Sequence, residues 1–170
     1  MTTAAGQPLP AGAWVLRALA VKDVFFEPPE HRTPTPDAFK PNSADIKEGE
    51  RRGLPVGVSV FDRARTTPEQ AVAIRCWFAQ KGGRDPPEYR VLEIAADQVR
   101  DIARAYNPDA DVISDPITDE GARDLPGADG HAAIRGLYQP DRKQRQSPDY
   151  KAMLDRLAGQ AQHPPDACSL

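Results

Sequence analysis

The chain has 170 residues, with 22 lysines and arginines against 25 aspartates and glutamates and a formal net charge of −3. This length fits one domain, and the near-neutral charge argues against a protein dedicated to duplex nucleic acid, which carries a basic field. The 18 prolines are roughly twice the usual share of about 5%. Because each proline fixes φ and removes a backbone donor, long uninterrupted helices and central strands are not expected over much of the chain.

The first third of the chain is predicted to be mostly irregular. Residues 1–12 are small and polar with two prolines, which indicates a flexible arm. Residues 14–21 alternate bulky and smaller side chains and favour a strand, although their alanines and leucines also suit a helix. No signal peptide or membrane span is expected here, because a basic start and sufficient apolar length are lacking. Residues 27–53 hold five prolines among charged side chains and predict a long loop or extended wrap, anchored by Phe39.

From residue 54 onward the pattern predicts a compact core. Short apolar runs rich in valine and isoleucine indicate strands, and the segments between them show the spacing of amphipathic helices. The sequence Thr67-Pro68-Glu69-Gln70 is typical of a capping box with proline at the first helical position. The predicted strands cover 55–61, 89–95, 111–114 and 131–137, and the predicted helices cover 67–80, 99–106 and 148–158.

These elements predict an α+β fold with a small mixed sheet of about four to five short strands and three helices, plus a long proline-rich N-terminal extended segment. The connections leave little room for a second domain. We therefore predict one domain over residues 13–158 with its compact core in 54–158, followed by a disordered tail over 159–170.

The most suggestive candidate site follows the predicted strand 111–114. If that strand pairs with the segment that begins at His131, Asp115 and His131 lie near the same end of the sheet. A carboxylate there orients the imidazole and raises its basicity, which suits a general base or a ligand contact. The structural alternative is an Asx turn at Asp115 before Pro116, with His131 bonded to a backbone carbonyl.

A second candidate site takes one polar residue from each of three predicted strands: Arg17, Ser59 and Glu93. In type and order they resemble the Arg, Ser and Glu of ADP-ribosyltransferase folds. The resemblance implies an enzyme in which Arg17 and Ser59 hold a dinucleotide and Glu93 stabilises the positive charge that develops at the ribose. The chain departs from that family in lacking its Ser-Thr-Ser run and in having Val91 two residues before the glutamate. The alternative is that these residues occupy solvated strand faces.

Metal and phosphate-loop motifs do not emerge from the sequence. The three histidines have no histidine or cysteine at ligand spacing. Cys76 and Cys168 suggest neither a disulfide framework nor a zinc site. The glycines at 82 and 83 follow a predicted helix, whereas a phosphate loop precedes one. We therefore predict no metal site and no cofactor, and a small-molecule ligand remains open.

These observations favour a small cytoplasmic accessory protein that binds a protein partner and no membrane. A proline-rich segment is already partly ordered and loses little entropy on binding, and the acidic loop around Asp119 is another candidate contact. The basic run 141–145 either meets an acidic partner or serves as a solvated linker. The alternative is a small enzyme, either nucleotide-handling or hydrolytic, that uses one of the two polar sets above. The predicted partner-contact residues are Pro34, Pro36, Phe39, Arg142, Lys143 and Arg145.

Overall fold

One antiparallel sheet of five strands runs through the computed structural model, which describes residues 5–165. The order of the strands is β3-β1-β2-β5-β4, and every neighbouring pair is antiparallel. The predicted α+β class is therefore confirmed, whereas the prediction of a mixed sheet is wrong. The strands are β1 (Trp14–Ala20), β2 (Gly57–Asp62), β3 (Tyr89–Ala95), β4 (Asp111–Ser114) and β5 (His131–Arg135).

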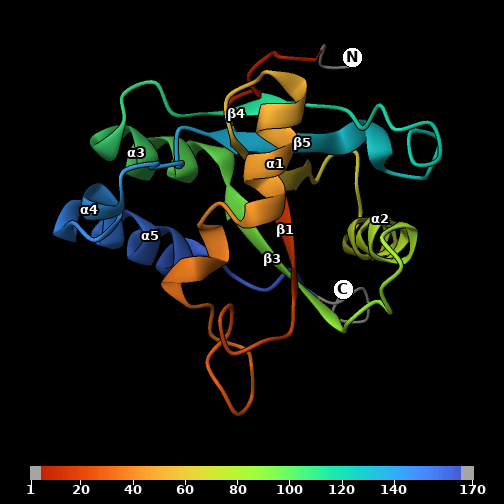
Figure 1. Cartoon of the computed structure of the whole chain (residues 1–170), viewed down its shortest axis with the longest axis horizontal. Helices are drawn as coiled ribbons and strands as arrows, with labels where there is room; N and C mark the ends of the chain where they lie inside the picture. The colour runs from red at the N-terminus through yellow and green to blue at the C-terminus, as the bar shows by residue number, and fades with distance from the viewer. Residues whose placement is uncertain (1–4, 166–170) are drawn as a thin grey trace.

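Five α-helices surround this sheet, and they cover both of its faces. Figure 1 shows α3 and α5 on one side of the sheet, α2 on the opposite side, and α1 lying in front of the strands. Within the larger core, α3 and α5 contact each other, and α5 also packs on the short 3-10 turn Pro36–Phe39. The helices are α1 (Ser43–Arg52), α2 (Pro68–Lys81), α3 (Ala96–Tyr106), α4 (Arg142–Arg145) and α5 (Pro148–Gln160).

Alternation along the strands divides the buried side chains between two cores. On β1, Val15 contributes to the larger core beneath α3 and α5, whereas its neighbour Leu16 contributes to the smaller core beneath α2. Phe61 and Ile74 complete the contact between the sheet and α2 in this smaller core. Successive side chains of a strand point to opposite faces, so the face that a polar strand residue occupies depends on its register.

The predicted number of three helices is wrong because α1 and α4 were not recognised. Helix α1 lies inside the segment 27–53, for which the proline content predicted a loop or wrap. The backbone nitrogens of Asn42 and Asp45 each bond to the other residue's side chain, which forms a capping box, and Gly53 ends the helix in the left-handed conformation. The residues that α1 buries are Asp45 and Gly49, so it has no apolar stripe that periodicity can detect.

Both ends of the described chain are attached to the sheet. The backbone nitrogens of Gly6 and Leu9 donate to the carbonyls of Ser114 and Val112 on β4, although the sequence predicted a flexible arm here. At the other end, α5 continues to Gln160 into the predicted disordered tail. The remainder of those two predictions, residues 1–4 and 166–170, lies outside the described residues.

Within residues 5–165, no helix combines the length and apolar character needed to span a membrane.

Gly57 allows β2 and β5 to approach each other closely. A Cβ atom at this position would lie 2.7 Å from the Cβ of Ala133. We expect Gly57→Ala to lower the free energy of unfolding by about 1–3 kcal/mol, because the two strands must separate to admit the methyl group. Denaturant unfolding measures this loss. The double variant with Ala133→Gly should recover part of it, and full stability of Gly57→Ala alone would contradict this account of the contact.

Candidate functional site

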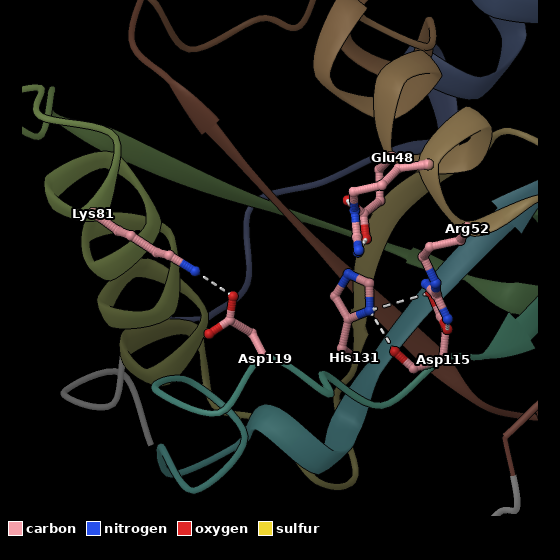
Figure 2. A network of polar contacts seen from close by, with 7 residues as sticks. Glu48, Arg52, Lys81, Asp115, Asp119 and His131 are labelled. Carbon is pink, nitrogen blue, oxygen red and sulfur yellow. Dashed lines mark hydrogen bonds and ion pairs between the residues drawn. The ribbon is translucent and has the colours of Figure 1, made fainter.

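A cleft of about 870 Å³ lies between α1 and α2, over one end of β2 and β5. Its strand-borne residues are Gly57 and Ser59 of β2, Tyr89 of β3, and His131, Ala133 and Arg135 of β5, and the loop 115–119 borders it. Figure 2 shows the charged side chains of this region, with Glu48 and Arg52 from α1 on one side and Lys81 from α2 on the other. The cleft is therefore rich in ionisable groups.

Ser59 and His131 form a hydrogen-bonded pair in this cleft. The register places His131 opposite Phe61 and Ala133 opposite Ser59, so all four side chains share the cleft face of the sheet. The distance between Ser59 Oγ and His131 Nε2 is 2.7 Å. Neither predicted site had joined these two residues, since Ser59 and His131 belonged to different hypotheses.

The other ring nitrogen of His131 determines the direction of that bond. His131 Nδ1 lies 2.6 Å from the backbone carbonyl oxygen of Asp115. A carbonyl oxygen only accepts, so Nδ1 carries the proton and donates it. The neutral ring then accepts at Nε2 from the hydroxyl of Ser59, which is the arrangement of a nucleophile beside its base.

Asp115 holds His131 through its backbone and Arg52 through its side chain. The pairing of β4 with β5, on which this candidate site depended, is present and brings Asp115 beside His131. The Asp115 carboxylate lies 3.9 Å from His131 Nδ1 and accepts two 2.8 Å hydrogen bonds from the guanidinium of Arg52. His131 thus bonds to a backbone carbonyl, as the structural alternative expected, whereas the Asp115 carboxylate bonds to Arg52 and adds a negative charge near the ring.

Burial lowers the pKa of His131 below its usual value of 6.5. The hydrogen bond to the Asp115 carbonyl and the Asp115 carboxylate oppose this shift, while the positive charges of Arg75 and Arg52 add to it. The side chain is 17% exposed, so one edge of the ring remains accessible from the cleft. His131 is therefore neutral and able to accept a proton at neutral pH.

The ion pair between Asp115 and Arg52 should make stability depend on acid pH. Burial alone would raise the pKa of Asp115, but the hydrogen bonds from Arg52 and the charges of His131, Arg52 and Arg135 together outweigh it, and the net pKa lies below its usual value of 3.8. Because the pKa of Asp115 is lower in the folded chain than in the unfolded chain, its ionised carboxylate stabilises the fold when the pH is above the unfolded pKa. This stabilisation is lost as the pH falls through the folded pKa. We expect Asp115→Asn to cost about 1–3 kcal/mol at pH 7 and progressively less below pH 4, measured by urea unfolding.

Asp124→Asn provides the control for that experiment. Asp124 is 90% exposed, and its oxygen lies 4.0 Å from the nearest guanidinium nitrogen of Arg123. Its substitution should leave the unfolding free energy unchanged at either pH, because exposed ion pairs contribute little. An equal effect of the two substitutions would contradict a specific role for the pair between Asp115 and Arg52.

The side chains that resemble an ADP-ribosyltransferase set do not converge on the cleft. Of the three, Ser59 lines the cleft, and Arg17 and Glu93 do not. The guanidinium of Arg17 is buried and donates to the backbone carbonyls of Ala38 and Ser59, and burial lowers its pKa to about 10. Glu93 pairs with Arg63 at 2.8 Å and accepts from the side chain of Gln162. The Arg17 side chain thus stabilises the backbone at Ala38 and Ser59, whereas the Glu93 side chain binds Arg63 and Gln162.

The predicted partner-contact residues lie in three different environments. Phe39 is fully buried in the larger core, so it is not available as a surface contact. Pro34 and Pro36 line a second hollow of about 540 Å³ beside the end of α5. On α4, Arg142 and Lys143 are exposed, whereas Arg145 donates to the backbone carbonyls of Gln139 and Pro140.

Several arginines that line the cleft were not predicted as site residues, among them Arg75 and Arg135. Arg75 comes from α2 and Arg135 from β5, and both line the cleft. Arg135 could have been found from strand alternation, since it follows His131 by four residues and therefore lies on the same face. Arg75 could not be identified in the same way, because the helix 67–80 is predicted from its apolar residues and its capping box, and neither feature marks an arginine as a site residue.

Comparison with known proteins finds no family model that matches the chain, and neither a curated protein nor a solved structure that is significantly similar to it. Across residues 5–165, no group of three or more histidine, cysteine, aspartate or glutamate side chains is arranged to hold a metal ion. The argument for function therefore rests on the geometry of the cleft.

Proposed function

We propose that this chain is a small hydrolase in which Ser59 is the nucleophile and His131 is its general base, acting on an ester. The observation that carries the proposal is the 2.7 Å contact between Ser59 Oγ and His131 Nε2 within an open cleft. A third group, the Asp115 carbonyl, orients the base from its other nitrogen. A nucleophile, a base and a group that orients the base form the general arrangement of serine-dependent acyl transfer.

The reaction follows from these contacts in two steps. Ser59 Oγ forms a bond to the carbonyl carbon of the ester while His131 Nε2 takes the hydroxyl proton, and the ring then returns that proton to the departing alcohol. Water next attacks the acyl group on Ser59 with His131 again as base, which releases the acid and restores the hydroxyl. The nearby carboxylate of Asp115 stabilises the imidazolium that forms in each step.

A fluorophosphonate probe tests this proposal without knowledge of the natural substrate, because it phosphonylates an activated serine. We expect labelling of the native chain at Ser59, mapped by mass spectrometry, together with turnover of nitrophenyl esters. Ser59→Ala should abolish both. Ser43→Ala is the matched control, since Ser43 is an exposed serine on α1 next to the cleft. No labelling at Ser59, or ester turnover that survives Ser59→Ala, would overturn the proposal.

Binding of a protein partner around Pro34 and Pro36 is a second proposal. The hollow beside these prolines supports it, because Ala158 of α5 and Ala161, which follows that helix, belong to the same lining and provide apolar surface. With a photo-crosslinking residue in place of Pro36, we expect one protein to be crosslinked to the chain in cells. The same crosslinking residue in place of exposed Arg123 is the control, and it should not crosslink that protein. Equal crosslinking at both positions would contradict this proposal.

A further inference from the structure

We infer that Arg75 and Arg135 form a binding subsite for a phosphate-type oxyanion beside Ser59. This inference rests on the proposed function and names the class of substrate: an ester that carries a phosphate group. Both residues line the cleft that contains Ser59 and His131.

The first argument is that one buried guanidinium nitrogen of each residue lacks a partner. The Nε atoms of Arg75 and Arg135 are buried and have no hydrogen-bond partner among residues 5–165. Buried donors without a partner are uncommon in folded proteins, and those that occur require an explanation. A bound oxyanion would satisfy these donors, because its oxygens match the planar fork of a guanidinium.

The second argument is the balance of charge in the cleft. Three of its carboxylates are already paired with cations: Glu48 with Arg51 and, as Figure 2 shows, Asp115 with Arg52 and Asp119 with Lys81. The fourth, Asp45, caps the start of α1 through the backbone nitrogen of Asn42. The charges of Arg75 and Arg135 are therefore left without a carboxylate partner in the described part of the chain, and they favour an anion.

The third argument is position relative to the nucleophile. Arg135 lies two residues beyond Ala133, which is opposite Ser59, so the two positions are about 7 Å apart along the strand. Arg75 reaches the cleft from the other side, on α2. Burial is the largest cause of the lowered pKa of His131, and the charge of Arg75 adds to it. Burial raises the pKa of Asp115, and the charge of Arg135 is among the influences that lower it. Both guanidiniums thus act on the groups that surround Ser59.

Two converging positive charges favour a phosphate over a carboxylate. A phosphate monoester carries nearly two negative charges at pH 7 and offers three acceptor oxygens, whereas a carboxylate carries one charge and two oxygens. Two guanidiniums can each form a forked contact with different oxygens of the same phosphate. An ester whose alcohol or acyl part bears a phosphate would place its scissile carbonyl at Ser59 while the phosphate remains at the arginines.

The test uses inorganic phosphate as the probe, titrated into the full chain by isothermal calorimetry at constant ionic strength. We expect saturable binding that Arg75→Gln and Arg135→Gln each weaken by about tenfold or more, since each loses charge-assisted hydrogen bonds. Arg156→Gln, which removes an exposed arginine of α5, should leave binding unchanged. Circular dichroism checks that each variant folds, and Arg135→Lys, which keeps the charge, should lose less affinity than Arg135→Gln.

Other outcomes of the same titrations separate this inference from the proposed hydrolase. Phosphate binding that survives both arginine substitutions, or acetate binding as tight as phosphate, would overturn the subsite. Ser59→Ala should retain phosphate binding and lose ester turnover. A chain that binds phosphate through the two arginines but shows no turnover contradicts the hydrolase alone, and turnover without saturable phosphate binding contradicts the subsite alone.

Discussion

His131→Gln is expected to slow the reaction of Ser59 with a fluorophosphonate by about 100- to 10,000-fold, the range in which general-base catalysis contributes. Glutamine can still hydrogen-bond to the Ser59 hydroxyl and the Asp115 carbonyl, so the cleft should keep its shape. It cannot accept a proton as imidazole does. The measurement is the rate of labelling at Ser59, with thermal unfolding of the same variant as the control for structure.

The pH dependence of that rate provides a second, independent readout. Because the pKa of His131 is lowered by burial and the neutral ring is the base, the native rate should rise with pH below 6.5 and be level at neutral pH. Arg75→Gln removes a positive charge that lowers this pKa, so the acidic limb should move to higher pH. Arg156→Gln should leave the limb in place.

A purely structural histidine would give different results in both experiments. His131→Gln would then label at the native rate while losing stability, and Arg75→Gln would not move the pH profile. Either result would remove His131 from the reaction and leave its two hydrogen bonds as contacts that fix the end of β5.

The strands were predictable because local sequence determines them. The bounds of β3 and β4 agree with the sequence prediction. A proline turn precedes β3, and β4 lies between Pro108 and Pro116. Helix α2 was equally clear, because Thr67 and Gln70 form the capping box that the sequence indicated. Helix α1 was missed because its signals are a polar cap and a closing glycine, without the apolar repeat on which helix prediction depends.

The site was only partly predictable because it depends on contacts between distant parts of the chain. Asp115 and His131 could be placed together from a single strand pairing, and the structure has that pairing. The contact between Ser59 and His131 requires β2 to pair with β5, and these residues are 72 positions apart. The face of the sheet that a residue occupies also depends on the strand register, which the sequence does not determine. Arg17 is an example. It lies opposite buried Leu92, and its guanidinium bonds to backbone instead of lining the cleft.

Phe39→Ala is expected to lower the free energy of unfolding by about 3–5 kcal/mol, the usual cost of truncating a fully buried phenylalanine. Phe39 has no exposed surface, and it lies in a 3-10 turn that packs against α5. Denaturant unfolding measures the loss. Val24→Ala is the matched control, because Val24 is 48% exposed and its truncation should change stability by less than about 0.5 kcal/mol.

The result also decides how a partner surface around the proline-rich segment should be mapped. If Phe39 belongs to the core, its truncation loosens the turn beneath Pro36, and any loss of partner binding in that variant follows from the loss of structure. Pro34 and Pro36 then become the residues to substitute, since they line the neighbouring hollow. Native stability of Phe39→Ala with loss of partner binding would instead make Phe39 a contact residue and contradict its place in the core.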